Sequence, residues 1–173
     1  IYEKSDPVIN ELYEKGKSVS LAHFEMMYDT LDSNFDYHFY ESESGKIGKK
    51  IVESFLGSVF EKSQGAVIFR GENYGLHTRV FLNAEGLPTY EAKELGLAKI
   101  KKDIFPYDVS LTVTANEQDD FFRVIEVAIG KVFPELDGKL RHVSHGVLKL
   151  TTGKMSSRTG GVIPANTFIE EVK

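Results

Sequence analysis

The chain has 173 residues, which fits one domain of ordinary size, and its 41% apolar content is enough to build a hydrophobic core. A net charge of -5 argues against a protein that coats nucleic acid by charge alone, because non-specific phosphate binding needs a basic surface. The chain has no cysteine, which excludes disulfides and thiolate chemistry. Its five histidines are scattered and are not spaced like the ligands of a metal ion. We therefore expect no structural metal, and because charges interrupt every apolar run we expect a cytoplasmic protein without a membrane span.

The first predicted elements are helical. Apolar residues recur at helical spacing over 5–16 and 18–31, which predicts two helices joined as a connecting hairpin. Alternating aromatic and polar residues over 35–40 predict a short strand. Ser44 then becomes a candidate N-cap for a helix that runs to about Lys62.

Strands and helices alternate through the rest of the chain. Two strand-like runs at 66–70 and 78–83 flank a glycine-bearing turn and predict a hairpin. The elements that follow are a helix over 89–101, a strand over 109–114, a helix over 119–132, a strand over 140–144 and helical residues at 168–172. Strands separated by helices predict an α/β fold with crossover connections.

The clearest chemistry lies in the loop 153–161, whose sequence is GKMSSRTGG. Glycines at both ends permit unusual backbone angles, hydroxyls and backbone N–H groups donate to anions, and Lys154 and Arg158 supply positive charge. Such a loop suits a polyphosphate, whose transfer needs charge stabilisation more than covalent help. Composition alone favours an ordinary basic surface loop, since short Gly/Ser/Lys segments are common and this one is not a Walker phosphate loop.

The string KMSSR at 154–158 resembles the KMSKS signature of class I aminoacyl-tRNA synthetases, in the form familiar from many arginyl enzymes. The strings at 86–94, 113–118 and 145–146 precede it in the order and spacing of arginyl-tRNA synthetases. The resemblance implies the second half of a Rossmann-like nucleotide-binding catalytic domain, with a parallel sheet, flanking helices and a small hairpin insertion.

The resemblance also implies a domain organisation. Residues 1–34 are expected to be a helical connecting segment, and residues 35–173 the C-terminal half of the catalytic domain. The family's other ATP motif, HIGH or a variant, does not occur in this sequence, and neither does the helical anticodon-binding domain. Together with a start at Ile1 and an end inside a helical stretch, this predicts a fragment that is inactive by itself.

Roles for individual residues follow from the family's motifs. Tyr90 and Glu94 match the tyrosine and the acid of the arginine pocket, and their spacing of four places both on one helix face. A carboxylate there can accept two parallel N–H bonds from a guanidinium, the pairing that separates arginine from lysine. Most members of the family have aspartate as this acid, so Glu94 departs from the family's pattern. Gln118 matches a glutamine near the bound arginine; without the resemblance, all three would be ordinary helix residues.

The ATP site is implied in the same way. Candidate ATP-binding residues are His145, Gly146, Val147, Lys154, Met155 and Ser156, and candidate catalytic residues are Lys154, Ser156, Ser157 and Arg158. The signature's second lysine is missing, which leaves open whether Arg158 takes over its charge. A metal site at His142 and His145 is the less favoured alternative.

The resemblance implies that the intact protein joins arginine to tRNA(Arg) through an arginyl-adenylate. ATP and Mg²⁺ would act as a substrate complex, without a tightly bound cofactor, and the protein is expected to be a monomer. RNA contacts would have to be local, and the lysine clusters at 46–50 and 99–102 are interpreted as solvated helix faces. Two alternatives stay open: a non-catalytic synthetase-like nucleotide- or RNA-binding module, and a different nucleotide-dependent transferase.

Overall fold

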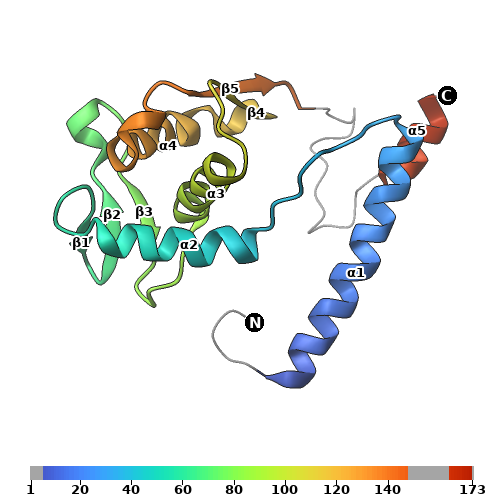
Figure 1. Cartoon of the computed structure of the whole chain (residues 1–173), viewed down its shortest axis with the longest axis horizontal. Coiled ribbons are helices and arrows are strands. Elements are labelled where there is room, and N and C mark those ends of the chain that lie inside the picture. The colour runs from blue at the N-terminus through green and yellow to red at the C-terminus, as the bar shows by residue number, and fades with distance from the viewer. Residues whose placement is uncertain (1–5, 148–163, 173) are drawn as a thin grey trace, which may run out of the picture. The chain divides into compact units, whose positions relative to one another are not determined.

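The computed structural model describes residues 6–147 and 164–172 (Figure 1). Residues 39–147 form one compact unit, which contains both β-sheets and most of the helices. The described residues on either side of this range belong to a second unit, which is helical.

Helix α1 (Pro7–Thr30) is a single continuous helix. Asp6 caps it, because its carboxylate accepts two backbone N–H groups of the first turn. The expectation of two helices, over 5–16 and 18–31, is therefore wrong. A glycine such as Gly16 inside a helix lowers its stability by only about 1 kcal/mol relative to alanine, and no proline follows that would interrupt the backbone hydrogen bonds. The helix therefore continues through Gly16.

The strand expected over 35–40 is also wrong, since within the described part of the chain these residues pair with no strand. The rings of Phe35 and His38 instead lie edge-on to Tyr28, with centroid distances of 4.7 and 6.5 Å. The alternation of aromatic residues reflects ring packing beside the end of α1. Near the other end of the chain, α5 (Ala165–Val172) confirms the predicted helix.

Helices α2 (Glu41–Ser54) and α3 (Tyr90–Ile104) cross with their backbones almost touching. A Cβ atom added to Gly96 would lie 1.9 Å from a backbone oxygen of α2, and one added to Gly48 would lie 1.7 Å from a backbone oxygen of α3. Only glycine leaves room for this approach. Both helices also contact the antiparallel sheet, so the crossing fixes the start of α3 relative to that sheet (Figure 1).

Gly96→Ala is expected to lower the free energy of unfolding by about 3 kcal/mol, because the added methyl fits only if the two helices separate. Gly16→Ala is the matched control, since a Cβ there meets nothing within 4 Å. That substitution should stabilise α1 by about 0.5–1 kcal/mol. Denaturant titration followed by circular dichroism measures both variants. Equal stability of Gly96→Ala and wild type would contradict the close crossing.

The bounds of α2 differ from the prediction at both ends. The helix begins before Ser44, which is buried at the crossing and donates its hydroxyl to the Glu41 carbonyl oxygen at 3.5 Å, so Ser44 is not the N-cap. The helix also ends well before Lys62. The chain turns at Gly57, whose φ of 86° suits glycine, and then enters β1 (Glu61–Ser63), a strand that the sequence did not predict.

The antiparallel sheet has the order β1, β2 (Ala66–Phe69), β3 (Arg79–Leu82). Strands β2 and β3 confirm the predicted hairpin, and β1 adds a third strand on the other side of β2. A short 3-10 helix, η1 (Gly71–Tyr74), lies in the hairpin connection. The hairpin therefore carries a structured turn.

The second sheet contains β4 (Ser110–Ala115) and β5 (Leu140–His145), which pair in parallel. Helix α4 (Asp119–Val132) connects them and has the bounds that the sequence predicted. Two short 3-10 helices, η2 (Asn116–Gln118) and η3 (Pro134–Leu136), flank α4. The α/β fold class is confirmed, with a parallel sheet, flanking helices and a small antiparallel hairpin.

The hydrophobic core of residues 39–147 lies among α2, α3, α4 and the antiparallel sheet. Its largest fully buried side chains are Phe60, Phe69, Phe81, Leu95, Ile125 and Ile129. None of the helices within the described ranges is long and apolar enough to span a bilayer.

One face of the parallel sheet is not covered by the described residues. Leu111 and Val113 on β4 are each 63% exposed, and Val143 on β5 is 47% exposed. These side chains share one face because alternate strand residues point the same way, and Val113 lies directly opposite Val143. Parallel sheets are normally covered on both faces, so this apolar face is unusual.

Candidate substrate site

The carboxyl edge of the parallel sheet brings together two of the predicted segments. Ala115 pairs with His145, so β4 and β5 both end at this edge. Gln118 follows β4 in η2, while Gly146 and Val147 follow β5. In open α/β sheets, ligands bind outside the carboxyl ends of the strands.

The side chains at this edge are open to a ligand. Gln118, His145, Gly146 and Val147 are all exposed. A ring nitrogen of His145, Nδ1, lies 2.7 Å from the carbonyl oxygen of Gly146, which holds the ring close to its own backbone. Gln118 precedes the first residue of α4 and makes no side-chain capping bond, so its amide is available.

His142, which the sequence prediction had only as a metal alternative, is a positioning residue whose side chain is largely covered. Its Nδ1 lies 3.2 Å from an Asp119 carboxylate oxygen, and its Nε2 lies 2.8 Å from the Thr114 hydroxyl. The ring stacks on Phe122 at a centroid distance of 4.4 Å. Since both ring nitrogens are engaged, His142 fixes the start of α4 against β4.

The metal alternative finds no support in these contacts. His142 and His145 are an odd number of positions apart on one strand, so their side chains point to opposite faces of the sheet. Within residues 6–147 and 164–172, no three His, Asp or Glu side chains gather as metal ligands.

Helix α3 carries the other two predicted residues of the arginine pocket. Tyr90 is its first residue and is 64% exposed, with the Lys93 ammonium 4.5 Å from its ring centroid. Lys93 also pairs with Glu41 at 2.7 Å. Glu94 lies one turn after Tyr90 and is half-buried. The spacing places both side chains on the same side of the helix.

The carboxylate of Glu94 sits in an environment that suits an incoming cation. Within the described part of the chain it has no hydrogen bond or ion pair. Burial raises the pKa of Glu94, an effect that Lys101 opposes and Glu41 reinforces. A half-buried carboxylate without a partner is unfavourable, and a bound guanidinium would remove that cost.

The lysine cluster at the end of α3 is bound within the molecule. Lys99 pairs with Asp103, and Lys102 pairs with Glu135. Both lysines therefore form ion pairs within the chain. Lys101 differs, because it is half-buried and donates to the Ser110 hydroxyl at 2.5 Å. Burial lowers the pKa of Lys101, and Glu94 raises it.

Arg79 links the starts of α3 and α4. Its Nη1 lies 3.9 Å from a carboxylate oxygen of Glu91, the neighbour of Tyr90. Its guanidinium carbon lies 5.9 Å from the ring centroid of Phe121, in the first turn of α4 after Gln118. The two helix starts that carry the predicted arginine-pocket residues are therefore neighbours. No pattern in the sequence indicates this role of Arg79.

The raised pKa of Glu94 predicts a stability effect with a definite sign. The folded chain binds the proton of the Glu94 carboxyl group more tightly than the unfolded chain does. The free energy of unfolding therefore falls as the pH rises from the unfolded-state pKa of 4.5 through the higher folded-state pKa. Glu94→Gln removes this titration and should raise the melting temperature relative to wild type at about pH 7.5, but not at about pH 4. Glu85→Gln, at an exposed turn, is the control. A stability difference that is the same at both pH values would contradict the buried carboxylate.

The remaining predicted residues, Lys154, Met155, Ser156, Ser157 and Arg158, lie outside the residues that the structure describes. Their assignment to an ATP loop therefore stays a prediction. The described site consists of Tyr90 and Glu94 on α3, Gln118 before α4, and the segment at the end of β5.

Comparison with known proteins identifies the family. A family model described as tRNA synthetases class I (R), catalytic domain, matches residues 2–173. The chain is 32% identical to an arginine--tRNA ligase of Bacteroides thetaiotaomicron and 30% identical to one of Parabacteroides distasonis, in each case over 99% of this chain. It spans only 29% of the length of these curated relatives.

Solved structures agree in fold. An arginyl-tRNA synthetase from Plasmodium falciparum matches 83% of this chain and 26% of its own, with a TM-score of 0.71 and 18% identity. The arginyl-tRNA synthetase of Thermus thermophilus matches 99% of this chain and 36% of its own, with a TM-score of 0.67 and 19% identity. On the match of the family model over almost the whole sequence, this chain belongs to the catalytic-domain family of the class I tRNA synthetases for arginine.

Proposed function

We propose that a protein containing this chain activates arginine with ATP and transfers it to tRNA(Arg). In the first step the arginine carboxylate attacks the α-phosphorus of ATP, which forms arginyl-adenylate and releases pyrophosphate. In the second step the arginyl group passes to a tRNA hydroxyl and AMP leaves. Mg²⁺ accompanies ATP as part of the substrate complex.

The observation that carries this proposal is the carboxylate of Glu94. It is half-buried and unpaired within the described residues, and it lies one helical turn from Tyr90. A carboxylate oxygen pair accepts two parallel N–H bonds from a guanidinium, whereas an ammonium acts as a point charge. We assign Tyr90, Glu94 and Gln118 to the arginine side chain, with Tyr90 as a wall and Gln118 as a further hydrogen-bond partner.

For ATP we assign two segments. His145, Gly146 and Val147 follow β5 at the carboxyl edge of the parallel sheet, where a glycine lets a ligand approach the backbone. The loop at 153–161 supplies Lys154 and Arg158 as cations and Met155, Ser156 and Ser157 between them. Their role would be to stabilise charge on the departing pyrophosphate.

The uncovered face of the parallel sheet supports a second part of the proposal. Leu111, Val113 and Val143 expose apolar side chains on a type of sheet that is normally covered on both faces. We propose that, in a protein of the relatives' length, other parts of the polypeptide cover this face and complete the ATP site. The isolated chain should then be inactive, and residues 35–173 would be the C-terminal half of the catalytic domain after a helical connecting segment at 1–34.

The cellular setting follows from the substrates. Because tRNA is the acceptor, we expect a cytoplasmic protein, and the absence of cysteine is compatible with a reducing compartment. We expect the active protein to be a monomer. Size-exclusion chromatography with light scattering would test that expectation.

Arginine-dependent exchange of pyrophosphate into ATP tests the proposal directly. The intact protein should catalyse this exchange with arginine and not with lysine. A second candidate is a synthetase-like module that binds nucleotide or RNA without catalysis. Binding of ATP without any exchange, in the intact protein with tRNA(Arg) present, would favour that candidate.

A further inference from the structure

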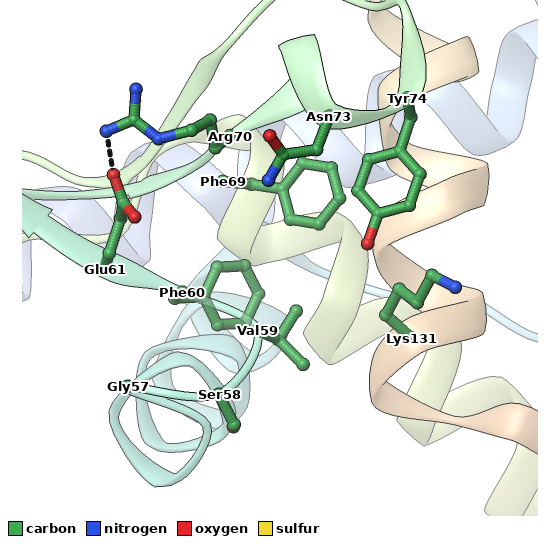
Figure 2. Close-up of a pocket in the computed structure, with 10 residues that line it drawn as sticks. All are labelled: Gly57, Ser58, Val59, Phe60, Glu61, Phe69, Arg70, Asn73, Tyr74 and Lys131. Carbon is green, nitrogen blue, oxygen red and sulfur yellow. Dashed lines mark hydrogen bonds and ion pairs between the residues drawn. The ribbon is translucent and has the colours of Figure 1, made fainter.

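A small cavity lies away from the proposed substrate site, between the turn after α2, the β2–η1 segment and α4 (Figure 2). Residues 57–61, 69–70 and 73–74 line it together with Lys131. Its volume is about 230 Å³. Pockets for drug-sized ligands occupy about 300–1,000 Å³, so this cavity suits one planar ring system and not a whole dinucleotide or cofactor.

The walls of the cavity are aromatic. The rings of Phe69 and Tyr74 are stacked, with centroids 5.5 Å apart and planes 9° apart. Phe69 is buried and Tyr74 is 45% exposed, so the pair runs from the core to the surface. Phe60, buried beside Phe69, forms the floor. Flat apolar walls of this kind bind other flat rings by stacking.

The rim of the cavity is polar and has a positive balance. Arg70 pairs with Glu61 at one side, as Figure 2 shows, and Lys131 lies at the other. The Lys131 ammonium is 5.3 Å from the Tyr74 ring centroid and has no ion pair within the described residues. The Asn73 amide likewise has no hydrogen bond there. Two cations face one carboxylate in a chain whose net charge is -5.

We propose that this cavity holds one unstacked nucleotide of an RNA strand. The base would lie against the exposed ring of Tyr74, which Phe69 supports from the core side, and the Asn73 amide would meet its edge as donor and acceptor. Lys131 would contact the adjoining phosphate. Aromatic rings beside a cation are the usual means by which proteins hold single-stranded nucleic acid. The proposal rests on the proposed function for the identity of the RNA, tRNA(Arg), and adds a contact outside the substrate site.

Fluorescence polarisation with a labelled single-stranded RNA of about twelve nucleotides tests the contact on the whole chain. Tyr74→Leu should weaken binding about tenfold, because stacking on the ring is lost while an apolar side chain remains. Tyr74→Phe keeps the ring and should bind as wild type. Unchanged affinity of Tyr74→Leu would overturn the proposal, provided that thermal unfolding shows the variant to be folded.

The salt dependence gives a second, independent readout. Lys131→Gln should reduce the slope of log Kd against log salt by about 0.7, the value for one phosphate contact on a single strand. Lys62→Gln is the control, because Lys62 is exposed on β1, carries the same charge and does not line the cavity. Equal slopes for both variants would mean that Lys131 contributes only long-range charge, and the proposal would fail.

Two further measurements separate the possible sources of the nucleotide. AMP should displace the labelled RNA only at concentrations far above those of unlabelled RNA; equal potency would assign the cavity to a free nucleotide and overturn the RNA proposal. In the intact protein, Tyr74→Leu should raise KM for tRNA(Arg) about tenfold and leave arginine-dependent pyrophosphate exchange unchanged. If Tyr74→Leu catalyses pyrophosphate exchange and its KM for tRNA(Arg) equals that of wild type, only the cavity proposal is refuted. If the wild-type protein catalyses no exchange, the proposed function is refuted.

Discussion

Glu94→Ala in the intact protein is expected to abolish the preference for arginine over lysine. Removing the buried partner of a charged group costs about 2–5 kcal/mol, and here the group is the guanidinium of the substrate. The loss should fall on kcat/KM for arginine in pyrophosphate exchange, while the rate with lysine, already low, changes little. We expect a free-energy cost in this range because Glu94 is half-buried and has no ion-pair partner within the described residues.

Two matched variants separate charge from shape. Glu94→Asp keeps the carboxylate and should retain the preference for arginine at reduced efficiency, because the shorter side chain shifts both oxygens. Glu94→Gln keeps the shape and should lose the preference while the fold becomes more stable near neutral pH, since burial raises the pKa of the carboxyl group. If Glu94→Ala has the same KM for arginine as wild type, the assignment of Glu94 to the arginine site is wrong.

The sequence predicted the elements best where one pattern dominates. The bounds of α4 agree because its apolar residues recur at helical spacing and acids stand in its first turn. The expected break in α1 was wrong, because Gly16 lowers helix propensity without preventing the next turn. The strand over 35–40 failed for another reason: periodicity of two does not reveal whether a partner strand exists.

The helix crossing shows a limit of local patterns. Ser44 has the residue type of an N-cap, but it lies inside α2 where that helix meets Gly96 of α3. The approach depends on residues far apart in the sequence, and no local pattern marks Gly48 and Gly96 as contacting a neighbouring helix. β1 escaped prediction for a similar reason, since its three residues are too few to show a period.

The candidate site was partly predictable. The motifs indicated Tyr90, Glu94 and Gln118, and helical spacing placed the first two on one face. Half-burial of Glu94 and the bridge through Arg79 could not be inferred, because both depend on contacts between elements that lie apart in the sequence; Arg79 on β3 joins the starts of α3 and α4. His142 looked like a possible metal ligand, and only its contacts with Asp119 and Thr114 assign it a positioning role.

The last expected result concerns the loop at 153–161. In the intact protein, Lys154→Ala should slow adenylate formation by an amount that corresponds to about 2–4 kcal/mol, the usual cost of removing one preorganised donor to a developing anion. Arginine binding should change far less, because negative charge grows on the pyrophosphate only as the bond to the α-phosphorus breaks. Single-turnover kinetics with saturating ATP and arginine measure the chemical step separately from binding.

Lys154→Arg is the matched variant, since it keeps the positive charge but changes its reach and geometry. Partial recovery relative to alanine would indicate that charge carries most of the effect. Arg158→Ala in the same assay tests whether Arg158 replaces the second lysine of the signature. A decrease in the rate of adenylate formation comparable to that of Lys154→Ala would indicate that it does. A chemical step of normal rate in Lys154→Ala would mean that the loop takes no part in adenylate formation, and the assignment of residues 153–161 to ATP would have to be abandoned.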